Sequence, residues 1–164
     1  MAILTASDRG AAGARADASG DTIAARCNAA GHALVKRLMV PDERAVIARA
    51  LADWCDAGLA DVIITTGGTG LTARDVTPEA TRDVAEREVP GIPIALALHG
   101  LKQTPYAALS RGIAVTRGRT LIVNLAGSPK AVAEGMDVLL PLLEHVADLL
   151  AGPVEHGGAA GAPT

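Results

Sequence analysis

Apolar residues along this chain fall into short β-branched runs separated by segments with helical spacing. Residues 61–66, Asp-Val-Ile-Ile-Thr-Thr, form a nearly continuous β-branched run, which is typical of a parallel strand buried on both faces. Four further runs have the length and composition of strands, and the last two are close enough to form an antiparallel pair through a tight turn. These four runs are 3–5, 33–40, 112–116 and 120–125.

The segments between these runs predict helices. Four of the predicted helices are 21–30, 77–89, 92–101 and 129–150. A fifth follows Pro41-Asp42-Glu43, and its apolar residues Val46, Ile47, Ala50, Leu51 and Trp54 lie on one face. Asp21, Thr77 and Ser128 are the expected N-caps, and Pro141 should kink the last helix or split it in two. Strands alternating with helices predict a three-layer αβα fold with a mostly parallel sheet and one antiparallel pair. We expect one domain over 1–152 and a flexible tail over 153–164.

Composition narrows the class of protein. Hydrophobic residues make up 49% of the 164 residues but aromatic residues only 1%, so the core has to rest on Leu, Ile and Val. The net charge of −3, without a basic block, argues against a nucleic-acid partner. No apolar run is long enough to span a bilayer, and no secretory signal is recognisable, so we expect a cytoplasmic protein with no membrane partner. Cys27 and Cys55 lie far apart and are expected to be reduced structural thiols.

Polar loops follow several predicted strands and should gather at one edge of the sheet. Gly67-Gly68-Thr69-Gly70 follows the strand at 61–66, where glycines let backbone N–H groups approach an anion, although such a loop alone is more often only a tight turn. The next loop contains Arg74 and Asp75. By itself Asp75 would more often be a surface cap or a partner of Arg74, but with the glycine turn it suits a phosphorylated ligand and a divalent metal.

The segments 65–70 and 74–80 resemble the signature of the molybdenum cofactor biosynthesis proteins of the Mog/MoaB type. That family includes bacterial molybdopterin adenylyltransferase and the matching domains of plant Cnx and animal gephyrin. The resemblance covers about residues 2–150, and its further collinear segments are 5–8, 40–43, 87–91, 109–111 and 124–130.

The resemblance implies a molybdopterin-binding domain, usually a homotrimer, whose activity is the adenylylation of molybdopterin. In that reaction the terminal phosphate of molybdopterin attacks the α-phosphate of ATP, and pyrophosphate leaves with Mg²⁺. The expected partners are therefore ATP and molybdopterin as substrates, together with a protein that inserts molybdenum afterwards.

Residue by residue, the resemblance assigns the family's two key aspartates, which are catalytic and bind the metal, to Asp42 and Asp75. From the residues alone, Asp42 also suits a helix N-cap. The implied ligand-binding residues are Ser7, Asp8, Gly67, Gly68, Thr69, Gly70, Arg74, Ser110, Gly127 and Ser128. The cations available to offset phosphate charge are Arg74, Arg111 and Lys130.

Two alternatives stand beside the enzyme. One is a non-catalytic molybdopterin-binding or scaffold protein of the same pathway; the segment from Arg74 to Pro78 favours the enzyme, whereas Ala126 replaces a proline that is common before the glycine. The other is a flavodoxin-like nucleotide binder, which is disfavoured because no aromatic pair is placed to sandwich a flavin. With Trp54 in a helical stripe, Tyr106 is the only ring left for a pocket.

Overall fold

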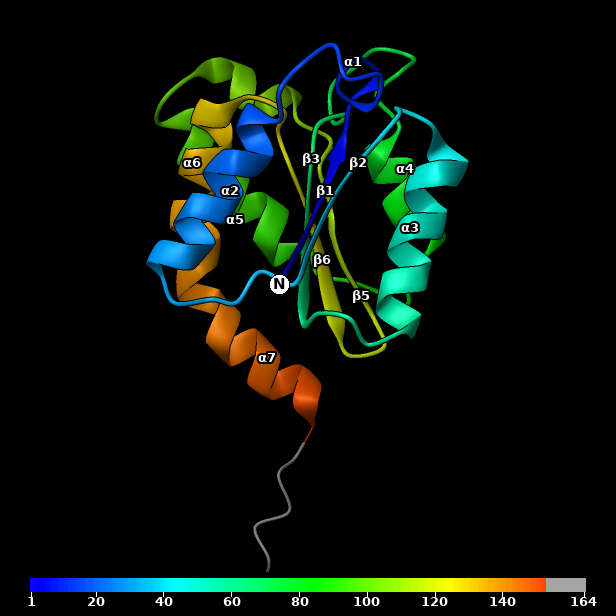
Figure 1. Cartoon of the computed structure of the whole chain (residues 1–164). Helices are drawn as coiled ribbons and strands as arrows, with labels where there is room; N and C mark the ends of the chain where they lie inside the picture. Colours follow the sequence, from blue (N-terminus) through cyan, green and yellow to red (C-terminus); the bar gives the residue numbers. More distant parts are fainter. Residues whose placement is uncertain (153–164) are drawn as a thin grey trace, which may run out of the picture.

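The computed structural model describes residues 1–152 and contains a six-stranded sheet with helices on both faces (Figure 1). The strand order is β2-β1-β3-β6-β5-β4, with β2, β1, β3 and β6 parallel and β5 and β4 antiparallel to their neighbours. The strands are β1 (Ala2–Ala6), β2 (Lys36–Val40), β3 (Val62–Thr66), β4 (Arg87–Glu88), β5 (Ala114–Arg117) and β6 (Thr120–Leu125). The three-layer αβα prediction is confirmed, and so is the antiparallel pair β5–β6. The tail predicted over 153–164 lies outside the described residues.

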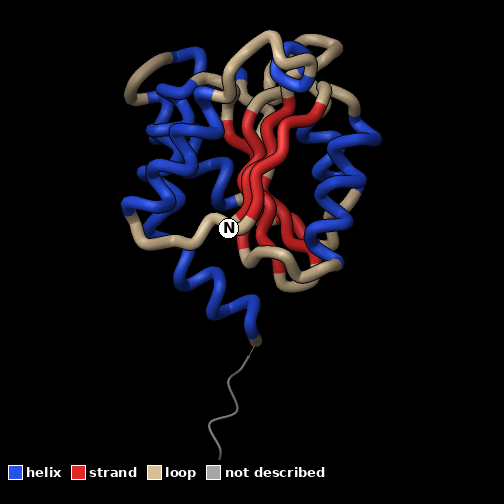
Figure 2. The backbone as a smooth tube through the Cα atoms, in the orientation of Figure 1, coloured by secondary structure: helices blue, strands red, loops and turns tan. Residues whose placement is uncertain are grey.

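Helices α2, α5 and α6 cover one face of the sheet, and α3 and α4 cover the other, as the tube in Figure 2 also shows. The helices are α1 (Asp8–Ala11), α2 (Ala18–Ala29), α3 (Arg44–Asp56), α4 (Thr77–Asp83), α5 (Gly91–Leu101), α6 (Pro129–Leu139) and α7 (Leu143–Ala151), with short 3₁₀ turns η1 (Pro105–Leu109) and η2 (Leu140–Leu142). Within 1–152, no helix has the length and apolar character needed to cross a membrane.

The strands supply two aliphatic cores because successive side chains point to opposite faces. In β3, Val62 and Ile64 pack towards α2, α5 and α6, whereas Ile63 packs towards α3 and α4. Trp54 is buried on α3 beside Ile47 and Leu51, as the helical stripe predicts. Val46 of the same predicted stripe is 37% exposed, because it lies at the margin of that helix face. Cys27 and Cys55 are buried free thiols.

The beginning of α2 differs from the prediction. The helix starts at Ala18, and its N-cap is Asp17, whose carboxylate accepts a hydrogen bond of 2.9 Å from the Gly20 N–H. The same carboxylate accepts hydrogen bonds of 3.0 and 3.1 Å from the Thr5 hydroxyl at the end of β1. Asp21 is therefore wrong as the cap, because the contact with β1 fixes Asp17 one turn earlier.

The helix predicted over 77–89 is also different. It ends at Asp83, and residues 87–88 form the edge strand β4 against β5. Val76 is the N-cap residue and no side chain caps the helix, so the prediction that Thr77 is the cap is wrong. In contrast, Ser128 caps α6 by accepting from the Ala131 N–H at 3.2 Å, and η2 separates α6 from α7 at Pro141, both as predicted.

The order of the strands creates a crevice at the carboxyl end of the sheet. β1 and β3 are parallel neighbours, but the chain leaves β1 for α2 on one face and leaves β3 for α4 on the other. Loops that diverge from adjacent parallel strands leave a gap between them, and ligands of open α/β sheets bind at such a point. The site is therefore expected above the ends of β1 and β3.

Candidate functional site

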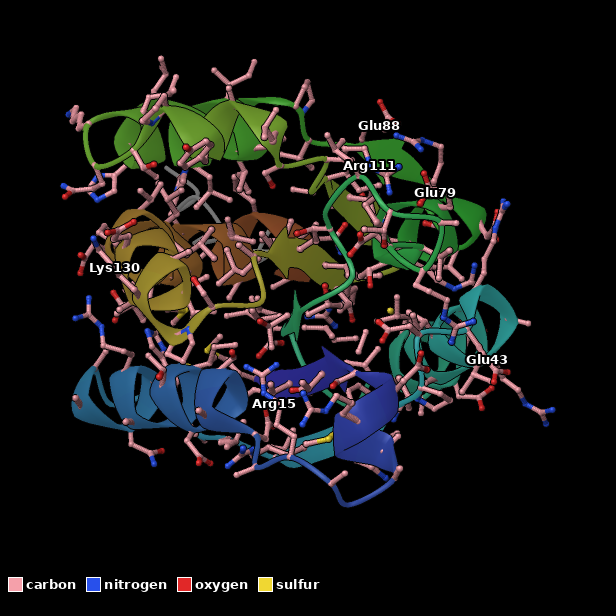
Figure 3. The ribbon with its side chains drawn as sticks, turned by 90° about the horizontal axis from the view of Figure 1, so that it is seen from above. Arg15, Glu43, Glu79, Glu88, Arg111 and Lys130 are labelled. Atoms are coloured by element: carbon pink, nitrogen blue, oxygen red, sulfur yellow. The ribbon has the colours of Figure 1, made fainter. Side chains whose placement is uncertain are left out.

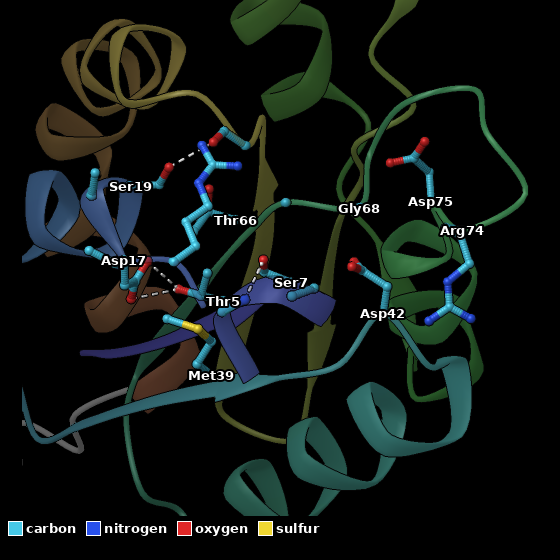
Figure 4. A pocket seen from close by; sticks show the side chains of 17 residues that line it. Thr5, Ser7, Asp17, Ser19, Met39, Asp42, Thr66, Gly68, Arg74 and Asp75 are labelled. Carbon is cyan, nitrogen blue, oxygen red and sulfur yellow. Dashed lines mark hydrogen bonds between the residues drawn. The ribbon is translucent and has the colours of Figure 1, made fainter. Parts of the chain in front are cut away.

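Two cavities open above the carboxyl ends of the strands, and they meet at the glycine turn. The polar pocket, of about 240 Å³, is bounded by residues 5–7, 15–19, 42, 66–68, 74–75 and 127 (Figure 4). The apolar pocket, of about 550 Å³, is bounded by residues 68–70, 93–100, 104–112 and 124–135 in part. Gly68, Asp75 and Gly127 line both cavities. Two ligands can therefore lie in separate pockets and meet at these three residues.

The turn between the pockets consists of Gly67 and Gly68, whose φ angles are +90° and +62°. A Cβ at Gly67 would lie 2.3 Å from the carbonyl oxygen of Ala6, so the turn rests directly on the backbone of β1. Gly127 approaches from β6, where a Cβ would lie 3.2 Å from the Gly67 Cα. Consecutive glycines in the left-handed region expose backbone N–H groups, which suits the turn for binding an anion.

Asp8 and Asp42 link the loops after β1 and β2. The Asp8 N–H donates to the Asp42 carboxylate at 2.9 Å, and the Asp42 N–H donates to the Asp8 carboxylate at 3.0 Å. Burial raises the pKa of Asp42, and the nearby Asp8 and Asp75 charges raise it further, while the Asp8 N–H lowers it. Asp42 is not the N-cap of α3, which is Glu43. Its half-buried carboxylate lines the polar pocket instead.

Arg74 is paired with Asp8. Its guanidinium donates to both oxygens of the Asp8 carboxylate at 2.7 Å, and this hydrogen-bonded partner lowers the pKa of Asp8. The pair is largely exposed, so we expect it to contribute little to stability and to be open to exchange with an incoming anion.

Asp75 is held from its own loop and not by Arg74. One carboxylate oxygen accepts from the Thr72 N–H at 2.8 Å and from the Thr72 hydroxyl at 2.6 Å, and the hydroxyl lowers the pKa of Asp75. The side chain is therefore ionised at neutral pH and borders both pockets. Figure 4 shows Asp42 and Asp75 on the same side of the polar pocket, with Arg74 beside them.

Arg111 holds the loop that carries these residues. Its side chain donates to the carbonyl oxygens of Gly70 at 2.7 Å and Asp75 at 2.5 Å, and it forms an ion pair with Glu79 (Figure 3). The backbone N–H of Arg111 donates to the Thr69 carbonyl at 3.0 Å. Because these acceptors occupy the guanidinium, Arg111 supports the glycine turn and the Asp75 loop, and is not free to bind phosphate.

Arg15 also lines the polar pocket, and it was not among the residues predicted from the sequence. It lies over the sheet in the view from above (Figure 3), and no ion pair involves it among the described residues. Ser7 also lines this pocket, but its hydroxyl accepts from the Gly10 N–H at 3.1 Å as the cap of α1. Arg15 stands in an Ala/Gly-rich loop whose pattern contains no signal for a binding residue.

The apolar pocket contains the remaining predicted ligand residues. Ser110 and Ser128 line it, although the Ser110 hydroxyl accepts from the Gly112 N–H at 3.3 Å and Ser128 caps α6. Tyr106 lines the same pocket and is 76% exposed. Lys130 is not among the residues that line either pocket, and its largely exposed ammonium lies 3.9 Å from Glu134.

The donors present suit a magnesium ion that arrives with a nucleotide. Within residues 1–152, no group of three or more His, Cys, Asp or Glu side chains is arranged to hold a metal. Mg²⁺ is commonly held by one or two carboxylates together with substrate phosphates, and Asp42 and Asp75 supply such a pair. Beside Gly68 and Asp42, the Thr77 hydroxyl is buried without a hydrogen-bond partner in the described part of the chain. The two carboxylates and the hydroxyl are oxygen donors, the kind of ligand that a hydrated divalent cation takes.

Comparison with known proteins identifies the family. A family model described as a probable molybdopterin binding domain matches residues 2–145. Molybdopterin adenylyltransferase of Helicobacter pylori strain J99 is 37% identical over 157 residues, which cover 93% of this chain and 88% of that protein. The molybdenum cofactor synthesis protein cinnamon of Drosophila melanogaster is 48% identical over 116 residues, which cover 71% of this chain and 19% of that protein. This chain thus matches about a fifth of the length of cinnamon.

The fold comparison agrees. The crystal structure of the molybdopterin biosynthesis enzyme MoaB of Thermus thermophilus superposes with a TM-score of 0.86 and 46% identity, covering 93% of this chain and 96% of that one. The family match spans the loops after β1, β2, β3 and β6 that form the two pockets. The chain belongs to the molybdopterin-binding domain family of molybdenum cofactor biosynthesis proteins.

Proposed function

We propose that this protein is a molybdopterin adenylyltransferase, which transfers the adenylyl group of ATP to the terminal phosphate of molybdopterin and releases pyrophosphate. The observation that carries the proposal is the junction of the two pockets at Gly68, Asp75 and Gly127. A reaction between two phosphorylated molecules requires two adjacent cavities whose phosphate-binding ends coincide. The adenylyltransferase relative named above supports the same reaction.

The chemistry places few demands on proton transfer. An oxygen of the molybdopterin phosphate forms a bond to the α-phosphorus of ATP, and the bond from that phosphorus to the bridging oxygen of pyrophosphate breaks. A phosphate monoester is ionised near neutral pH, so the nucleophile needs no general base. The protein's task is to hold the two anions in line and to offset their charge.

The residues of the site divide this task. The backbone N–H groups around Gly67–Gly70 bind phosphate oxygens, and Arg111 keeps that turn and the Asp75 carbonyl in place. Arg15 supplies a guanidinium that has no ion-pair partner within residues 1–152, and Arg74 can exchange Asp8 for a phosphate. Asp42 and Asp75 would hold Mg²⁺. When bound, that ion would neutralise charge on the phosphates and the departing pyrophosphate.

The test is direct. Purified protein incubated with molybdopterin, ATP and Mg²⁺ is expected to form adenylylated molybdopterin and pyrophosphate in equal amounts, measured by chromatography and a pyrophosphate assay. Protein that binds molybdopterin but forms neither product would instead be the non-catalytic binding or scaffold protein of the pathway.

We further propose that the chain forms a homotrimer. Ile94, Leu98 and Leu101 lie at helical spacing on α5 and are 58%, 60% and 45% exposed, and Tyr106 and Leu109 of η1 continue this apolar surface. Exposed contiguous apolar surface on a small protein marks an interface. Because Tyr106 and Leu109 also line the apolar pocket, assembly through this face would shape its mouth. Light scattering is expected to give three times the chain mass, and a monomer mass would contradict the trimer.

The cellular setting is also a proposal. Two buried free thiols fit a reducing compartment such as the cytoplasm, where ATP is available. The adenylylated product still lacks its metal, so we infer that the downstream partner is a protein that inserts molybdenum.

A further inference from the structure

Thr77 stands out among the buried polar residues. Its side chain is fully buried, yet its hydroxyl has no hydrogen-bond partner among the residues that the structure describes. The neighbouring threonines are satisfied, since the hydroxyls of Thr65 and Thr81 each accept 2.9 Å hydrogen bonds from the Asn124 amide. A buried hydroxyl without a partner loses its hydration and gains nothing in exchange, so its presence calls for a function.

The local structure does not use this hydroxyl. Although Thr77 directly precedes Pro78 at the start of α4, the hydroxyl caps no N–H of that helix. The Thr77 backbone does the structural work by donating from its N–H to the Gly68 carbonyl at 3.0 Å. The hydroxyl is therefore dispensable for the fold of α4 and for its connection to the glycine turn.

The hydroxyl lies beside the glycine turn and Asp42. A Cβ placed on Gly68 would lie 2.4 Å from the Thr77 hydroxyl oxygen and 3.2 Å from an Asp42 carboxylate oxygen. The two oxygens are thus no farther apart than the sum of these two distances, and no hydrogen bond joins them directly. One oxygen-bound ion or water between two such oxygens spans this range. A side chain at residue 68 would collide with the Thr77 hydroxyl, so glycine at this position keeps the hydroxyl close to the turn and to Asp42.

We propose that the Thr77 hydroxyl is a third oxygen of the divalent-cation site, acting with Asp42 and Asp75 on the ion or on one of its waters. A threonine hydroxyl beside a glycine-rich phosphate-binding turn has the same chemistry in other nucleotide-binding sites, where it binds Mg²⁺. This inference rests on the proposed function, because the cation is the one that accompanies ATP.

The experiment compares Thr77→Val, Thr77→Ser and a matched control, Thr120→Val. Valine has nearly the shape of threonine but no hydroxyl. The control changes a threonine that is equally buried but donates to the Ala60 carbonyl at 2.8 Å, below the opposite end of the sheet. Mn²⁺ binding by each variant is measured by electron paramagnetic resonance, with and without an ATP analogue that has a methylene between the α- and β-phosphates. The Tm of each variant is measured without ligand.

We expect Thr77→Val and Thr120→Val to differ both in Tm and in Mn²⁺ binding. Thr77→Val should keep or raise the Tm, because it removes an unpartnered hydroxyl, and should weaken Mn²⁺ binding in the presence of the analogue by about tenfold. Thr77→Ser should bind Mn²⁺ within about threefold of the parent chain, whereas Thr120→Val should lower the Tm and leave Mn²⁺ binding unchanged.

Parent-like Mn²⁺ binding by Thr77→Val would overturn the inference, as would a parent protein that binds no Mn²⁺. Formation of adenylylated molybdopterin by the parent protein would leave the proposed function standing in either case. Conversely, Mn²⁺ binding that depends on the Thr77 hydroxyl in a protein that forms no product would contradict the proposed function alone.

Discussion

Asp75→Asn is expected to lower kcat for adenylylated molybdopterin by about 100-fold or more while leaving the fold intact, on the scale of losing one electrostatic group at a reacting phosphate. Asparagine retains an oxygen that can accept from the Thr72 N–H and hydroxyl, so the loop keeps its hydrogen bonds. The negative charge that faces both pockets is removed. The measurement is steady-state turnover under saturating ATP and Mg²⁺, with Mn²⁺ affinity and Tm recorded for the same preparation.

A charge-matched control separates the site from general electrostatics. Asp56→Asn removes a carboxylate that pairs with Arg117 at 2.8 Å, outside both pockets. The Asp56 carboxylate is 60% exposed, so the variant is expected to retain parent kcat and a Tm within a few degrees. Parent-like turnover by Asp75→Asn would remove Asp75 from the metal site, whereas equal losses in both variants would point to net charge as the cause.

The three-layer fold could be predicted because its strands are strongly patterned. The run 61–66 is apolar and β-branched, and all five residues of β3 are buried in the sheet. Pro141 and Ser128 act locally, through the missing N–H of proline and the short reach of a serine cap, so their effects are readable in the sequence. Elements that depend on residues nearby in the chain were thus the predictable ones.

The errors arise where distant segments decide the outcome. Asp17 and Asp21 both suit a cap in isolation, and the hydrogen bonds from the Thr5 hydroxyl of β1 favour Asp17. The strand β4 is two residues long and exists because the edge of β5 is available to pair with it. The periodicity of apolar residues in the sequence reveals neither the hydrogen bonds between Thr5 and Asp17 nor the pairing of β4 with β5.

The residues of the candidate site also fall into those that the sequence predicts and those that only the folded structure reveals. The glycine turn, Asp42 and Asp75 could be located because motifs mark them and parallel strands bring their loops together. The role of Arg111 could not be predicted, because its acceptors include the backbone carbonyls of Gly70 and Asp75. Every residue has a backbone carbonyl, so such acceptors leave no signal in a sequence. Arg15 and the unpartnered hydroxyl of Thr77 became candidates only once the packing was known.

Gly67→Ala is expected to be the most damaging single methyl group in the site. The residue has φ of +90°, where an L side chain is strained, and its new Cβ would lie 2.3 Å from the Ala6 carbonyl oxygen. That oxygen belongs to the backbone of β1 and cannot turn aside as a flexible side chain would. We expect a loss of about 3 kcal/mol or more in the free energy of unfolding, measured in urea, because strain and overpacking add.

Gly118→Ala is the matched control for this effect. Gly118, in the turn between β5 and β6, also has a positive φ, +54°, but no atom of the described residues beyond its chain neighbours lies within 4 Å of its Cβ position. This variant should show the conformational cost alone, about 1 kcal/mol, and parent-like turnover. The difference between the two alanine variants then measures the contact of the glycine turn with β1.

Equal destabilisation would mean that β1 yields to the methyl group, and the turn would not be held rigidly above the strand ends. A larger loss in Gly67→Ala together with loss of product formation would tie catalysis to the close approach of this turn to the sheet.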